Sequence, residues 1–152
     1  MEKIASFCVD HTKLFPGIYI SRIDGDIITY DIRMVKPNTP PYLSNGALHT
    51  IEHLFATFAR NSEYADRVIY FGPMGCRTGF YFLLRNVPKK ETINLIIRIF
   101  RQIADYDGEI PGTTASECGN YREHDLVGAK KCAKEFLPVI ENWDETKLTY
   151  NK

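Results

Sequence analysis

The stretch GALHTIEHLFATFAR, residues 46–60, places two histidines and a glutamate in a run whose apolar residues recur at helical spacing. Because an α-helix turns by about 100° per residue, His49, Glu52 and His53 fall within roughly 100° of arc on one side of it. Imidazoles at positions i and i+4 lie close enough to share a metal ion, and a carboxylate at i+3 can move protons beside that ion. The spacing predicts a helix with a core face and a metal-binding face.

A second interpretation of the same stretch is a solvated polar helix face, because a single helical histidine is more often a surface residue than a ligand. A metal centre also needs a third ligand, and the cysteines are the first candidates. In a reducing compartment the four cysteines are packed thiols, ligands or reactive groups rather than a disulfide framework. They are Cys8, Cys76, Cys118 and Cys132.

Two of these cysteines are predicted to be structural and two lie in turn-rich loops. Cys132 belongs to a helical apolar repeat and is expected in the core, and Cys8 has no chemical neighbour in sequence and is also expected to be structural. Cys118, in SECGNY, lies in a short loop from which it can approach a metal. Two histidines and one thiolate leave a fourth tetrahedral position open, as in catalytic zinc sites.

The loop GPMGCRTG holds Cys76 in a tightly turned backbone. Arg77 beside it, or another nearby cation, would favour the thiolate, which is the form that a nucleophilic or acid–base cysteine requires. The alternative is a small residue fitted into a crowded turn, and the loop alone favours neither interpretation.

Composition bounds the class of protein. The 152 residues are 44% hydrophobic and 12% aromatic, which suits one globular domain with a core of its own, covering residues 1–152. Basic and acidic residues are equal at 19 each, so the bulk charge gives no reason to expect nucleic acid or a membrane surface as a partner. The N-terminus lacks an apolar signal region, and no stretch approaches the ~20 apolar residues of a membrane span, so we expect a cytoplasmic protein.

The elements that must position these residues alternate between strand and helix patterns. The strand-rich runs 17–23 and 26–35 are joined through Asp24-Gly25, a strong hairpin signal, and 67–71 and 79–87 are two more strand candidates. Residues 91–106 form a second amphipathic helix, and a third begins near His124 or Asp125. This order predicts an α+β fold in which an antiparallel β-sheet packs against α-helices.

Five motifs, in order and spread over most of the chain, together resemble the S-ribosylhomocysteine lyase (LuxS) family. They are SFCVDHT, YDIR, LHTIEHLFA, PMGCRTGFY and ECGNYREHDL. The resemblance implies a homodimer with active sites at the subunit interface. It also implies that His49, His53 and Cys118 bind one divalent metal per subunit, with water as the remaining ligand. That metal is Fe2+ natively, which Zn2+ or Co2+ can replace.

The resemblance further implies which residues carry the reaction. It gives Glu52 and Cys76 as the acid–base groups, and it matches Ser6, His11, Asp31 and Arg33 to substrate-binding positions. The implied reaction opens the ribose of S-ribosylhomocysteine, moves its carbonyl by two enolisations, and eliminates homocysteine. The other product, 4,5-dihydroxy-2,3-pentanedione, is the precursor of a quorum-sensing autoinducer, and the homocysteine returns to the methionine cycle.

Three residues depart from the family pattern, and two other functions stay open. Tyr70 and Gly72 stand where most members have an acidic residue and a serine, and Glu117 stands where a glutamine usually precedes the metal cysteine.

A zinc peptidase is one alternative function, with Glu117 or Glu123 as the third ligand and no need for Cys76. A catalytically silent metal-binding or scaffold domain is the other.

Overall fold

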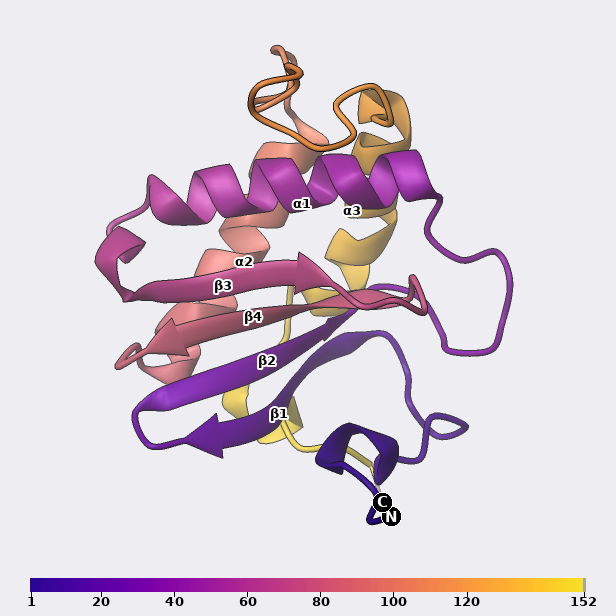
Figure 1. The fold of residues 1–152 in the computed structure, drawn as a ribbon. Helices are drawn as coiled ribbons and strands as arrows, with labels where there is room; N and C mark the ends of the chain where they lie inside the picture. The colour runs from indigo at the N-terminus through magenta and orange to yellow at the C-terminus, as the bar shows by residue number, and fades with distance from the viewer. Residues whose placement is uncertain (152) are drawn as a thin grey trace.

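The computed structural model describes residues 1–151 as a four-stranded antiparallel sheet with three helices packed against one face (Figure 1). The strands, in the spatial order β1-β2-β4-β3, are β1 (Gly17–Asp24), β2 (Ile27–Arg33), β3 (Val68–Pro73) and β4 (Gly79–Arg85). The helices are α1 (Asn45–Arg60), α2 (Lys89–Ala104) and α3 (Leu126–Ile140), with short 3-10 turns η1 (Ala5–Phe7), η2 (Ala65–Arg67) and η3 (Glu145–Lys147). The predicted α+β class is confirmed.

The first hairpin forms where the sequence predicts it. Strands β1 and β2 pair antiparallel from Gly17 opposite Arg33 to Asp24 opposite Ile27. Gly25 in the turn has a φ of 62°, a left-handed conformation that glycine adopts without steric cost. The Asp24-Gly25 signal therefore marks a real turn.

The two faces of the sheet carry different chemistry, because successive side chains of a strand point to opposite faces. Phe80, Phe82 and Leu84 of β4 are buried in the core with the helices. On β2, the alternate residues Asp31 and Arg33 point to the other face, and both are also buried. The second face is therefore not simply a solvated surface.

Helix α1 is fixed by a cap and by its apolar stripe. The side chain of Ser44, the N-cap residue, accepts a hydrogen bond from the backbone N–H of Ala47. Leu54 and Phe55 are almost fully buried, and the Phe55 ring stacks on Phe71 of β3 with centroids 3.9 Å apart. Burial of each such side chain stabilises the fold by about 1.5–3 kcal/mol. This packing sets how the helix is rotated about its axis.

The other two helices follow their predicted positions with small differences. Helix α2 begins at Lys89, two residues before the predicted start, and α3 begins after Asp125, whose carboxylate accepts a hydrogen bond from the N–H of Gly128. Helix α3 also contains Pro138 near its C-terminal end. Within residues 1–151, none of the helices combines the length and apolarity needed to cross a bilayer.

The two cysteines predicted to be structural have different outcomes. Cys132 is half-buried and packs against the core, as predicted. The same prediction was wrong for Cys8, which is exposed and whose thiol donates only to the carbonyl of Ile4, 3.6 Å away. Cys8 follows η1 in the N-terminal segment, outside the hydrophobic core cluster, which leaves its side chain exposed.

Candidate active site

Four potential metal donors converge beside α1. One ligand atom from each of four side chains lies within 4.8 Å of every other, and these residues are His49, His53, Cys118 and His124. The first two come from α1, and the other two come from the segment between α2 and α3, which lies on the side of α1 away from the sheet (Figure 1). The structure thus brings together the three predicted ligands and adds a histidine that was predicted only as a residue near a helix start.

Backbone carbonyls orient the two helical histidines. The Nδ1 atom of His49 lies 2.9 Å from the carbonyl oxygen of Glu123, and that of His53 lies 2.8 Å from the carbonyl oxygen of Pro111. Because a carbonyl can only accept, each Nδ1 carries the proton and each Nε2 keeps its lone pair. This is the tautomer and the outer hydrogen bond that a metal-bound histidine usually has.

The turn after Pro111 requires a glycine. Gly112 has a φ of 73°, in the left-handed region, and a Cβ atom built on it would lie 3.1 Å from Nδ1 of His53. A larger residue would therefore meet both backbone strain and the imidazole that the Pro111 carbonyl orients. Sequence reasoning did not find this support, because a backbone carbonyl has no residue type to signal it.

Cys118 completes a donor set suited to a transition metal. Its Sγ lies 3.4 Å from Nε2 of His49, and the backbone N–H of Asn120 donates to that sulfur over 3.5 Å. Two imidazole nitrogens and one thiolate are ligands that zinc and similar divalent ions accept. The residues present therefore fit a divalent transition metal with an open position.

His124 is the addition that the sequence analysis missed. Its ring stacks on His49 at 3.9 Å, and its Nδ1 lies 3.0 Å from Oγ1 of Thr50. Burial is the main cause that lowers the pKa of His124 to about 4, and repulsion from His49 and His53, whenever these are protonated, acts in the same direction. Its Nε2 is buried without a hydrogen-bond partner within residues 1–151. A neutral imidazole with an unsatisfied nitrogen beside the donor set is consistent with a bound group there.

The glutamates of the peptidase alternative are not part of this donor set. The Glu117 carboxylate accepts a hydrogen bond from Oγ1 of Thr114 at 2.6 Å, and that of Glu123 accepts one from the amide of Asn120 at 2.8 Å. Glu52, in contrast, is half-buried on α1, one residue before His53. The structure thus favours Cys118 over either glutamate as the third ligand.

A second polar cluster surrounds Cys76. Ser6, His11, Arg33 and Cys76 line one pocket of about 410 Å3. Asp31 is 1% exposed and lies beneath this pocket, where its two carboxylate oxygens accept hydrogen bonds from Arg33 at 3.1 and 2.7 Å. The five predicted residues of this region are therefore gathered in one place.

The cation that hydrogen bonds link to the Cys76 thiol is not its neighbour in sequence. Arg77 donates instead to the carbonyl of Leu43 over 3.3 Å. Nη1 of Arg33 donates to Oγ1 of Thr78 at 2.8 Å, and this hydroxyl lies 3.1 Å from Sγ of Cys76. Burial is the largest single effect and lowers the pKa of Arg33, but the charge of Asp31, its hydrogen bonds and the smaller contributions of Cys76 and Tyr150 together outweigh it, so the pKa is raised overall. Arg33 is thus a permanent positive charge linked to the thiol through Thr78.

The metal donors and the Cys76 cluster are separate within one chain. Neither of the two pockets lined by Cys76 and His11 is lined by a metal donor or by Glu52. Tyr70, which departs from the family pattern, lies on the Cys76 side, where it lines a pocket of about 290 Å3 with Ser6 and Tyr81. The predicted catalytic residues Glu52 and Cys76 therefore lie in two different half-sites. Glu52 lies with the metal donors, which form the metal half, and Cys76 lies with Ser6, His11 and Arg33, which form the Cys76 half.

Comparisons with known proteins point to one family. The family model described as S-ribosylhomocysteinase (LuxS) matches residues 4–147. The chain is 51% identical to the S-ribosylhomocysteine lyase of Desulfotalea psychrophila, 48% to that of Borreliella afzelii and 47% to that of Clostridium acetobutylicum, each over 99% of both chains. With its donor set, its cysteine loop and this similarity over nearly its whole length, the chain belongs to the S-ribosylhomocysteinase (LuxS) family.

Proposed function

We propose that this protein is a metal-dependent S-ribosylhomocysteine lyase, with residues 1–152 as a single catalytic domain. It cleaves S-ribosylhomocysteine to homocysteine and 4,5-dihydroxy-2,3-pentanedione, the autoinducer precursor. The observation that carries the proposal is the convergence of His49, His53 and Cys118 in a chain of this family. We expect the protein to act in the cytoplasm, where homocysteine would re-enter the methionine cycle.

The proposed cofactor is one divalent metal per subunit, Fe2+ natively, with Zn2+ or Co2+ as substitutes. His49, His53 and Cys118 would hold it, since their donor atoms already lie together and carbonyls orient both imidazoles. When bound, such an ion supplies a Lewis acid that polarises a carbonyl oxygen. Enolisation needs this polarisation because the proton removed lies alpha to that carbonyl.

Glu52 and Cys76 divide the proton transfers. In each enolisation one group removes a proton from a sugar carbon and another protonates the neighbouring carbon or oxygen, so the carbonyl moves along the chain. Glu52 is half-buried beside His53, and Cys76 is linked through Thr78 to the positive charge of Arg33. The final elimination removes one more proton and expels homocysteine as a thiol. Neither group is assigned as a metal ligand, so both remain free for this task.

Substrate binding is assigned to the Cys76 half. Ser6, His11 and Arg33 line the pocket beside the thiol and offer hydroxyl, imidazole and guanidinium groups to a polar sugar. Asp31 contributes by holding Arg33, since its carboxylate is buried and engaged by that side chain. A small polar substrate fits the mixed polar lining of this pocket.

The separation of the two halves supports a homodimer with active sites at the interface. A complete site needs Glu52 with the metal donors from one copy and Cys76 with its neighbours from another. Phe7 and Tyr70, on the Cys76 side, are 70% and 54% exposed, although both are large apolar side chains. Pairing of two copies around a two-fold axis would cover such residues and join the halves.

The activity itself is tested by incubating the purified protein with S-ribosylhomocysteine and titrating the released thiol. We expect homocysteine to appear in step with consumption of substrate, because elimination frees one thiol per turnover. A protein that instead cleaves peptides would support the zinc peptidase, and one that does neither would support a silent metal-binding domain. Either result contradicts the lyase assignment.

Removal of any one metal ligand is expected to abolish stoichiometric metal binding. His49→Ala, His53→Ala and Cys118→Ala each leave only two of the three assigned ligands, which cannot maintain a three-ligand site. Elemental analysis of the purified variants measures this loss, and Cys8→Ala, which changes an exposed thiol outside the donor set, is the matched control. Full metal occupancy in Cys118→Ala would mean that another residue, such as Glu117, is the third ligand.

Composite sites predict rescue between two inactive variants. His53→Ala lacks the metal half and His11→Ala lacks the substrate half, so a mixed dimer would contain one intact site. We expect mixing to restore part of the thiol release, whereas each variant alone stays inactive. Native mass spectrometry confirms subunit exchange, and continued inactivity after exchange would mean that each site is built within one chain.

Loss of either acid–base group should separate catalysis from metal binding. Cys76→Ala and Glu52→Gln are expected to keep the fold and the metal, whereas turnover falls by about 100-fold or more, the usual scale for a positioned acid–base group. Cys76→Asp should retain partial activity, because a carboxylate also accepts a proton. Exchange of substrate protons with solvent deuterium, followed by NMR, identifies the blocked step. Unchanged turnover in metal-replete Cys76→Ala would refute the assignment.

A further inference from the structure

A buried ion pair links the C-terminal tail to the Cys76 thiol. Asp31 and Arg33 are 1% and 2% exposed, and they lie on the face of the sheet opposite the helices. Nη1 of Arg33 also donates a hydrogen bond to Oγ1 of Thr78, and this hydroxyl oxygen lies 3.1 Å from Sγ of Cys76. A buried carboxylate needs further donors besides its cation, because each unsatisfied oxygen keeps its desolvation cost. The remaining donor comes from far along the chain.

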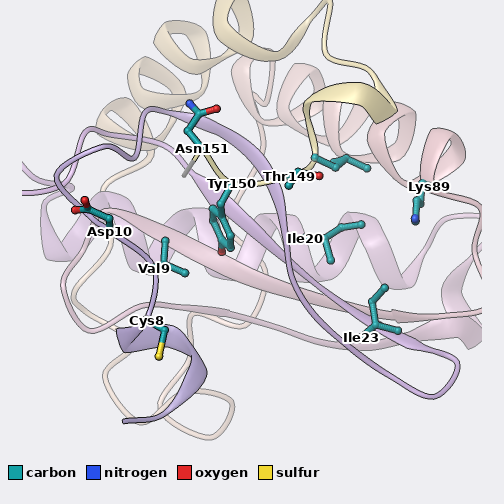
Figure 2. A pocket seen from close by; sticks show the side chains of 10 residues that line it. Cys8, Val9, Asp10, Ile20, Ile23, Lys89, Thr149, Tyr150 and Asn151 are labelled. Atoms are coloured by element: carbon teal, nitrogen blue, oxygen red, sulfur yellow. The ribbon is translucent and has the colours of Figure 1, made fainter.

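That donor is Tyr150. Its hydroxyl donates to Oδ2 of Asp31 at 2.6 Å, across 119 positions of sequence. Burial, the charge of Asp31 and this hydrogen bond together raise the pKa of Tyr150 well above its ordinary value, so the phenol stays protonated and can only donate here. Figure 2 shows the Tyr150 ring between Val9 of the N-terminal segment and Ile20 of β1, where it lines a cleft of about 640 Å3.

The tail that carries Tyr150 is fixed on β1. The backbone N–H of Ile20 donates to the carbonyl of Leu148 at 2.7 Å, and Leu148 is 2% exposed. The indole N–H of Trp143 donates to the carbonyl of Ile18 at 2.8 Å. The Tyr150 ring also stacks on Tyr19, with centroids 5.2 Å apart and planes at 21°. The phenol is therefore held in place rather than free to sample the surface.

We propose that Tyr150 is a positioning residue for Cys76: its hydroxyl holds the Asp31 carboxylate, which holds Arg33, which orients the thiol through Thr78. Without this hydroxyl the Asp31 carboxylate has one hydrogen-bond donor fewer and interacts more strongly with the Arg33 guanidinium. The guanidinium then offers less positive charge and a less fixed geometry to the Thr78 hydroxyl and the thiol. The catalytic consequence rests on the proposed role of Cys76 as an acid–base group, whereas the effect on the thiol does not.

The experiment uses Tyr150→Phe, which keeps the ring and its stacking on Tyr19 and removes only the hydroxyl. We expect the rate at which iodoacetamide alkylates Cys76 at pH 7, followed by peptide mass spectrometry, to fall by about three- to tenfold, the scale of one ordinary net hydrogen bond. We expect kcat for thiol release to fall by a similar factor, and KM to rise as well, because Arg33 also lines the proposed substrate pocket. The metal content is expected to remain that of the wild type.

The matched control is Tyr64→Phe. The Tyr64 hydroxyl also donates to a carboxylate, that of Glu91 at 2.9 Å, but it precedes η2 and β3, at the opposite end of β3 from the Cys76 loop. We expect its alkylation rate and its kcat to match the wild type. This control separates loss of a phenol–carboxylate hydrogen bond in general from loss of the one that reaches Cys76.

A rate of Cys76 alkylation in Tyr150→Phe equal to or above that of the wild type would overturn the proposal. A lowered melting temperature with unchanged alkylation would also overturn it, because the hydroxyl would then be structural only. In an Asp31→Asn background, Tyr150→Phe should cause no further slowing, since the link is already broken. If the wild type released no thiol from substrate, the proposed function would fail, but the alkylation comparison would still decide the role of Tyr150.

Discussion

The packing of the apolar stripe of α1 on the sheet is the constraint on which the metal donors depend. Leu54 and Phe55 are almost fully buried, and the stack of Phe55 on Phe71 ties the helix to β3. Because the rotation of the helix is then fixed, the side chains about half a turn away must face the segment between α2 and α3. His49 and His53 are therefore aimed by residues that take no part in their chemistry. A repacked core would move both imidazoles together.

The sequence predicted this half of the site as far as side chains could reveal it. Helical periodicity placed His49, Glu52 and His53 on one face, and the resemblance assigned Cys118 as the third ligand. The carbonyls of Pro111 and Glu123 could not be predicted, since every residue has a carbonyl and only the folded loop decides where it points. His124 could have been suspected as a further histidine near Cys118, but its position in a helix cap motif gave it another explanation.

The Cys76 half was harder to predict because its contacts are distant in sequence. Strand alternation on β2 puts Asp31 and Arg33 on one face, yet it does not say that this face is buried. Cys76 stood beside Arg77, so the neighbouring arginine was the natural candidate for its cation, and only the fold shows that Arg33 reaches it through Thr78. Local patterns predict elements well, whereas polar networks form between elements and leave no periodic signal.

The division of the site into two halves has a chemical reason in the proposed dimer. A thiol close to two histidines and a thiolate can enter the coordination sphere of a transition metal and fill the position that substrate must occupy. Within one chain the Cys76 pocket is not lined by His49, His53 or Cys118, so Cys76 cannot complete a four-ligand structural site as the chain folds. In the proposed dimer the two groups would meet only when a second copy docks, after each half has been fixed by its own core contacts. The fold thus keeps Cys76, proposed to transfer protons, apart from Cys118, proposed to bind the metal, although both cysteines lie in short turn-rich loops.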